Sequence, residues 1–415
     1  MLYFKKIRKS NYVVIGILTI VYFSNVMFST LNDSNRISFQ TNDDKKFAGS
    51  ASCAGCHKDI YESHIKTAHY LDSRPASKEF IKGSFSPGKN KFIYNKWMEV
   101  LMEQRNDTFY QTAYINGNAL QNGSFDIVIG SGRKGQTYLY WNDNELFQLP
   151  VSYYTPLDSW CNSPGFPTKF IKFDRMIPAE CLECHGTYAK AEQVGDNQYL
   201  YDKTSIIYGI DCERCHGPGA EHVAFHSKNQ QDTSAKFIIG TKQLNRQQRL
   251  DACALCHSGF RKAIKPAFSF VVGNKLDDYS GTSYSSDSIS TLDVHGNQYG
   301  LLMASKCFQM ARQLDCSSCH NVHVNEANNP KIFSQRCITC HMETNHTSFK
   351  LPANKGVTLS DNCINCHMPM LPSGKIVLDV ANSDKAVPDM VRTHRVAIYP
   401  DNTKEYLEKI NFKQP

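Results

Sequence analysis

Seven times in this 415-residue chain, a pair of cysteines separated by two residues is followed directly by histidine. This spacing is the attachment site of c-type haem. Two thiols so placed can bond to the two vinyl groups of one porphyrin as thioethers, and the adjoining imidazole then lies under the iron as its proximal ligand. The sequence therefore predicts seven covalently bound haem c groups, and the motifs, numbered 1 to 7 in chain order, are Cys53, Cys56 and His57; Cys181, Cys184 and His185; Cys212, Cys215 and His216; Cys253, Cys256 and His257; Cys316, Cys319 and His320; Cys337, Cys340 and His341; and Cys363, Cys366 and His367.

Other uses of paired cysteines fit this pattern poorly. Zinc sites need no histidine directly after every pair, and disulfide frameworks belong to short secreted domains whose cysteines are not coupled to histidine. Only Cys161 and Cys307 lie outside the motifs. We expect them to be buried thiols or to form one disulfide, and the sequence leaves both possibilities open.

Eight histidines lie outside the motifs, and in a multihaem cytochrome a second imidazole is the usual sixth ligand of the iron. Coordination by two histidines leaves no open position and favours electron transfer over chemistry at the iron. His323 and His346 each follow a motif histidine too closely to reach the opposite face of the same haem, so we expect them to bind neighbouring irons. His64 and His226 each lie near a better-placed histidine and rank lowest.

The first 30 residues are typical of an export signal. A basic start precedes an apolar run over residues 12–28, which is just long enough to span a bilayer, and no clear cleavage site follows. We expect an uncleaved anchor in the inner membrane rather than a cleaved signal, with the rest of the chain on the periplasmic side. Cleavage would instead release a soluble periplasmic protein.

The formal charge of +7 gives no indication of nucleic-acid binding. Four of the basic residues lie in the anchor segment, the others are scattered along the chain, and the two propionates of each haem add negative charge.

The predicted fold class is α+β: a mainly helical and irregular multihaem cytochrome organised around packed haems, with an inserted antiparallel β-rich subdomain. Residues 90–160 alternate aromatic or β-branched residues with polar ones between turn signals, which indicates strands. Residues 274–290 are rich in Ser, Asp and Gly, which indicates a surface loop. The expected organisation is an anchor (1–30), a polar tether (31–50), a first haem segment (51–89), the β-rich subdomain (90–160), a cluster of haems 2–4 (161–260), a spacer loop (261–299), a cluster of haems 5–7 (300–400) and a C-terminal tail (401–415).

Gly130, Gly132 and Gly135 spell the G-x-G-x-x-G fingerprint of dinucleotide-binding proteins directly after a strand-like segment. That fingerprint requires a helix next, whereas here the strand-like QTYLYW follows. We therefore predict a glycine-rich hairpin turn and no nucleotide cofactor.

The residues that flank the motifs resemble those of the cytochrome c-554-related multihaem family, over about residues 50–400. The opening CAGCHKDIYESHIKTAHY resembles the family's first haem motif and its Trp-x-x-Ser-x-His pattern, with His64 where Trp is usual and Thr67 where Ser is usual. The segments CERCHGPGAEH, SKCF to CSSCHNVH, and CINCHMP with the later THR resemble further parts of the family. The resemblance implies that the distal ligands include His69, His222, His295, His323 and His394.

Two functions remain open. The first is electron transfer in the bacterial cell envelope, between a quinol-oxidising complex or other cytochromes and a further redox partner. The second is oxidation or reduction of a small nitrogen or sulfur compound at one five-coordinate haem, since relatives of cytochrome c-554 include hydroxylamine oxidoreductase and nitrite reductases. The resemblance implies the haem of Cys181, Cys184 and His185 as the open one, whereas His64 or His226 at its iron would leave a pure conductor. A third possibility is a haem-bearing subunit that docks through its β-rich part.

Overall fold

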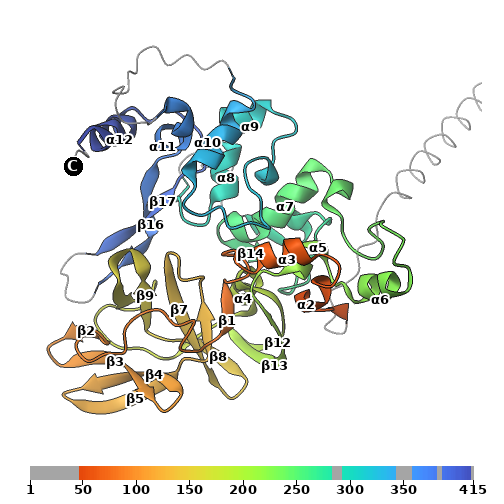
Figure 1. Ribbon diagram of the computed structural model, residues 1–415. Coiled ribbons are helices and arrows are strands. Elements are labelled where there is room, and N and C mark those ends of the chain that lie inside the picture. Colours follow the sequence, from red (N-terminus) through yellow and green to blue (C-terminus); the bar gives the residue numbers. More distant parts are fainter. Residues whose placement is uncertain (1–45, 283–291, 343–357, 381–385, 413–415) are drawn as a thin grey trace, which may run out of the picture. The chain divides into compact units, whose positions relative to one another are not determined.

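The computed structural model describes residues 46–282, 292–342, 358–380 and 386–412 (Figure 1). The expected membrane anchor, most of the tether and His346 lie outside the described residues. None of the helices in the described ranges combines the length and apolar character needed to cross a bilayer.

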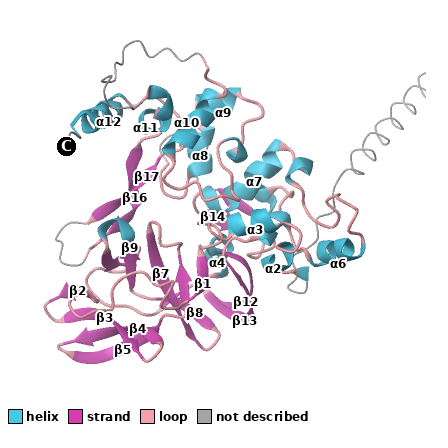
Figure 2. Ribbon diagram, in the orientation of Figure 1, coloured by secondary structure: helices cyan, strands magenta, loops and turns pink. Residues whose placement is uncertain are grey.

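Short helices precede and follow a long run of antiparallel strands, and three hairpins lie between the later helices (Figure 2). The α-helices are α2 (Ser50–Cys53), α3 (Lys58–His64), α4 (Ala179–His185), α5 (Cys212–His216), α6 (Ala220–Lys228), α7 (Arg246–His257), α8 (Gln298–Met303), α9 (Lys306–Met310), α10 (Pro330–Ile338), α11 (Cys363–His367) and α12 (Pro400–Phe412). The strands are β1 (Ser73–Pro75), β2 (Lys91–Asn95), β3 (Met98–Arg105), β4 (Thr108–Ile115), β5 (Asn118–Ser124), β6 (Ile127–Ile129), β7 (Gly135–Asn142), β8 (Glu145–Gln148), β9 (Val151–Tyr154), β10 (Ser159–Asn162), β11 (Arg175–Met176), β12 (Gly186–Gly195), β13 (Gln198–Tyr208), β14 (Arg261–Ala263), β15 (Ser280–Thr282), β16 (Met370–Leu378) and β17 (Val387–Arg392).

Two antiparallel sheets form the β-rich part. Strands β2 to β5 make a four-stranded meander, and β1, β6 to β9, β10 and β11 make a seven-stranded sheet. The largest core cluster joins the two sheets, with Met102 and Phe109 from the meander packed with Tyr138 and Trp160 from the other sheet. The alternation of apolar and polar residues in these strands places one face of each sheet in this core.

The predicted α+β fold class is confirmed, but the structure also contains two long hairpins that were not predicted. β12 pairs with β13 between motifs 2 and 3, and β16 pairs with β17 after motif 7, where only short helices and loops were expected. Part of the predicted surface loop at 274–290 is also ordered and partly buried. Leu276 is only 1% exposed, and its backbone N–H donates to the carboxylate of Asp251, which fixes this turn against α7.

The glycine-rich segment forms the hairpin turn that the sequence predicted. Gly130 and Gly132 adopt positive φ angles of 99° and 78°, which favour glycine. Antiparallel β7, rather than a helix, follows the turn and pairs with β6. The fingerprint is therefore a turn between two strands.

Candidate haem centres

Each described motif lies on a helical turn. Helices α4, α5, α7 and α11 end at the histidine of motifs 2, 3, 4 and 7. In the other three motifs, the histidine N–H donates to the carbonyl of the first cysteine at 2.8–3.0 Å, which closes the same i to i−4 turn. One helical turn brings both thiols and the imidazole to the same side of the backbone, as attachment to one porphyrin requires.

Two motif histidines and one predicted distal histidine have a ring nitrogen within hydrogen-bond distance of a backbone carbonyl. Nδ1 of His216 lies 2.7 Å from the carbonyl oxygen of Ile239, and Nδ1 of His367 lies 2.9 Å from that of Ala397. Nδ1 of His222, a predicted distal ligand, lies 2.8 Å from the carbonyl oxygen of Lys236. Such a bond fixes the proton on Nδ1 and leaves Nε2 as the metal ligand.

Within the described residues, four motif histidines face a second histidine at a nearly constant distance. A ring nitrogen lies about 1.1 Å from its ring centre and a metal–imidazole bond is about 2.0 Å long, so two rings on one ion have centres about 6.2 Å apart. The pairs and the distances between their ring centres are His57 and His222 at 6.5 Å, His216 and His323 at 6.2 Å, His257 and His69 at 6.1 Å, and His320 and His394 at 6.1 Å. This spacing fits one haem iron between each pair.

The electrostatics of the distal histidines suit metal binding. Burial lowers the pKa of His69 and of His394 to about 4, and the facing motif histidine adds to the effect in each case. Burial also lowers the pKa of His323. These imidazoles are therefore neutral near pH 7, and the neutral form is the one that binds a metal.

The geometry separates His69 from His64. His69 faces a motif histidine, whereas Nε2 of His64 lies 3.8 Å from the carboxylate of Asp211. The ring centre of His64 also lies 6.2 Å from that of His323, but neither residue belongs to a motif. His226 contacts His222 at 4.5 Å between ring centres. His64 and His226 thus lie beside predicted distal ligands, and neither faces a motif histidine among the described residues.

Motif 2 differs from the four paired centres. No described histidine ring faces His185 at the paired distance. His185 is nevertheless one of the groups that lower the pKa of His295, where burial is the main cause, so the two rings lie within electrostatic range. The Nδ1 atom of His185 lies 2.8 Å from the carboxylate of Asp72. Burial lowers the pKa of His185, but the hydrogen bond and charge of Asp72 outweigh it, and the net shift is upward.

The motif 6 histidine, His341, has no facing histidine ring among the described residues. His346, the predicted distal ligand that follows motif 6, lies outside them.

The motif cysteines show which haem centres are neighbours. Three pairs of cysteines from different motifs lie close enough to interact directly. They are Cys53 and Cys212 of motifs 1 and 3, Cys184 and Cys256 of motifs 2 and 4, and Cys253 and Cys316 of motifs 4 and 5. Three further pairs of cysteines lie farther apart but within electrostatic range: Cys215 and Cys253 of motifs 3 and 4, Cys319 and Cys340 of motifs 5 and 6, and Cys337 and Cys363 of motifs 6 and 7. The contact between motifs 4 and 5 links residues 161–260 with residues 300–400, the two expected haem clusters.

The two cysteines outside the motifs are both free. Cys161 is buried beside Tyr154 and Leu378, and burial raises its pKa to about 12. Cys307 instead lies near the motif cysteines Cys319 and Cys337. Of the two alternatives left open, free thiols hold rather than a disulfide.

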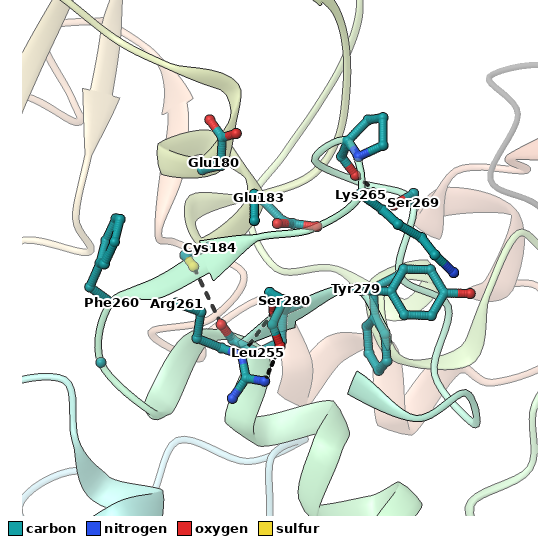
Figure 3. Close-up of a pocket in the computed structure, with 14 residues that line it drawn as sticks. Glu180, Glu183, Cys184, Leu255, Phe260, Arg261, Lys265, Ser269, Tyr279 and Ser280 are labelled. Atoms are coloured by element: carbon teal, nitrogen blue, oxygen red, sulfur yellow. Dashed lines mark hydrogen bonds between the residues drawn. The ribbon is translucent and has the colours of Figure 1, made fainter. Parts of the chain in front are cut away.

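A cavity of about 100 Å³ lies beside Cys184, between α4 and the β14–β15 hairpin (Figure 3). Arg261 lines it, but the guanidinium already bonds to Ser258, Asp277 and Ser280. Lys265 places its ammonium group 3.8 Å from the centre of the Tyr279 ring. The cationic groups of this cavity are thus engaged within the protein.

The groups that orient the motif histidines could not be predicted from the sequence. The carbonyls of Ile239 and Ala397 and the carboxylate of Asp72 carry no sequence signal, because any residue supplies a carbonyl and aspartate is common in loops.

The seven motifs, the paired imidazoles and the comparisons that follow are those of a multihaem c-type cytochrome. Residues 169–217, which contain motifs 2 and 3, match the family described as cytochrome c554 and c-prime, in agreement with the predicted resemblance. The chain is also similar to the crystal structure of outer cell wall cytochrome OcwA, with a TM-score of 0.53 and 16% sequence identity over 87% of this chain and 81% of that one. At this identity, the likeness is one of fold. Comparison with curated proteins gave no match.

Proposed function

We propose that the protein is a heptahaem electron-transfer cytochrome of the bacterial cell envelope, in which most irons are bound by two histidines. The observation that carries the proposal is the set of four histidine pairs with ring centres 6.1–6.5 Å apart. Two axial imidazoles close the iron to substrates and keep the ligand set unchanged between the ferric and ferrous states. Such centres conduct electrons.

The cysteine contacts support a branched path through these centres. Attached porphyrins must approach one another where their thioether sulfurs do, and the neighbouring cysteines connect motifs 1, 3, 4, 5, 6 and 7 in that order. Motif 2 joins this series at motif 4 through Cys184 and Cys256.

Mass spectrometry and electron paramagnetic resonance test the proposal together. The intact mass of the purified protein is expected to include seven haems, one for each motif. Most of the ferric iron is expected to be low-spin. A mass with six or fewer haems would overturn the count, and predominantly high-spin iron would overturn the coordination.

A second candidate function is reduction or oxidation of a small nitrogen or sulfur compound at motif 2. It is favoured by the lack of a described histidine at pairing distance from His185, and opposed by the engaged cations of the neighbouring cavity. An open iron is expected to show a high-spin signal that nitric oxide or cyanide removes. If neither probe changes the spectrum, this candidate fails and His295 becomes the expected sixth ligand of motif 2.

We further propose that the N-terminal segment holds the protein on the periplasmic side of the inner membrane. There it would exchange electrons with a quinol-oxidising complex or another cytochrome. The support is the basic start and the apolar run over residues 12–28. Fractionation of cells that express the full chain tests this: release into the soluble periplasmic fraction would contradict the anchor.

A further inference from the structure

The proximal histidine of motif 2 has a charged hydrogen-bond partner. Nδ1 of His185 lies 2.8 Å from the carboxylate of Asp72, whereas Nδ1 of His216 and of His367 bond to neutral carbonyl oxygens. A hydrogen bond to an ionised acceptor is about twice as strong as one between neutral groups. The motif 2 imidazole is therefore set apart by the charge of its partner.

Asp72 is held firmly in this position. Its backbone N–H donates to the carbonyl of His69 at 3.1 Å, and its own carbonyl accepts from the N–H of Gly130 at 2.5 Å. The carboxylate is only 24% exposed, so water screens it incompletely. Arg74 lies within electrostatic range, but its guanidinium bonds to the carbonyl of Leu71 and stacks on the ring of Phe80.

This contact acts on the iron through the imidazole. A carboxylate that accepts the Nδ1 proton makes the ring a stronger electron donor at Nε2. A stronger donor stabilises ferric iron more than ferrous iron, which lowers the reduction potential. We propose that Asp72 tunes the motif 2 haem to a lower potential than it would have with a neutral partner on His185. The proposal rests on the haem assignment of the proposed function.

The same loop serves a second haem centre. His69, three residues before Asp72, faces the motif 4 histidine His257, and the Asp72 charge reaches both rings. A smaller effect is therefore expected at motif 4, the neighbour that motif 2 contacts through Cys184 and Cys256. A lower potential at motif 2 would favour transfer of an electron from this haem to its neighbour at motif 4, so the branch is suited to be a point of electron entry.

The test is a spectroelectrochemical titration of the full holoprotein and its Asp72→Asn variant. Asparagine keeps the shape and can still accept the hydrogen bond, so the substitution removes only the charge. The reduction potential of one haem is expected to rise by at least about 59 mV, which is about tenfold in its one-electron ferric–ferrous equilibrium constant. A second haem is expected to show a smaller rise. The matched control is Asp202→Asn, which removes an exposed carboxylate from the β12–β13 hairpin and is expected to shift no couple. Asp72→Glu, which keeps the charge, is expected to stay close to the wild type.

The outcomes are distinct. An unchanged set of couples in a fully loaded Asp72→Asn protein overturns the tuning role. Should that variant load fewer haems, Asp72→Ser replaces it, since a hydroxyl can also accept from Nδ1 without charge. Loss of the haem from both variants, but not from Asp72→Glu, assigns Asp72 a structural role and overturns the proposal. Lack of a haem at motif 2 in the wild-type mass spectrum is a failure of the proposed function instead.

Discussion

Replacement of His69 by alanine tests the assignment of distal ligands most directly. The ring centre of His69 lies 6.1 Å from that of His257, which fits two metal bonds of about 2.0 Å to one iron. His64, which is five residues earlier and buried, lies beside Asp211 instead. The two histidines therefore provide a variant and its matched control within one segment.

We expect His69→Ala to convert one iron from low-spin to high-spin, because water or an empty position replaces a strong ligand. With seven motifs loaded, this is about one-seventh of the total iron. His64→Ala is expected to leave the high-spin fraction unchanged. Electron paramagnetic resonance of the ferric proteins, with spin quantitation, measures both fractions.

Added imidazole distinguishes loss of a ligand from loss of structure. Free imidazole can enter the space left by the His69 side chain and is expected to restore the low-spin signal. A high-spin signal in His64→Ala but not in His69→Ala would show that the pairing deduced from the ring geometry is wrong. A high-spin signal in both, without rescue by imidazole, would indicate a general disturbance of the segment.

Three further predictions concern stability and processing. Glu326→Gln should lower the free energy of unfolding by about 2 kcal/mol, because Glu326 pairs with Arg336 between motifs 5 and 6 and is only 9% exposed. The hydrogen bond from Arg336 lowers the pKa of Glu326 in the folded protein. The stability that Glu326 contributes is therefore present above the pKa that it has in the unfolded chain, and is lost as the pH falls through its pKa in the folded protein. Thermal unfolding measured from pH 7 to 3 should accordingly show a smaller loss of stability in the variant than in the wild type. Trp160→Ala should cost about 4 kcal/mol, since this 2%-exposed indole fills the core between the sheets and donates to the carbonyl of Ser84; a denaturant midpoint equal to that of the wild type would contradict this. N-terminal sequencing of the mature protein should find the chain uncleaved, and a start near residues 30–45 would show a cleaved signal.

Much of the fold was accessible from local patterns. The alternation over residues 90–160 indicated an antiparallel β-rich part, and strands β2 to β10 lie there. The β12–β13 hairpin was not predicted, although Gly195 to Asn197 supply a turn signal between two alternating segments, because residues 161–260 were assigned to a helical and irregular haem cluster. Leu276 shows the opposite error, where a polar composition concealed one buried anchor.

The sequence by itself determined the chemistry that is local along the chain. Attachment of a haem needs two thiols and an imidazole within five residues, so a pentapeptide identifies it wherever it folds. The facing histidines are different in kind, because they come from distant segments: His57 faces His222, and His257 faces His69. Only packing of the intervening elements decides that His69 rather than His64 faces a motif histidine, and that the carboxylate of Asp72 lies against His185. Covalent attachment is written in adjacent residues, whereas coordination and tuning depend on distances that only the tertiary structure sets.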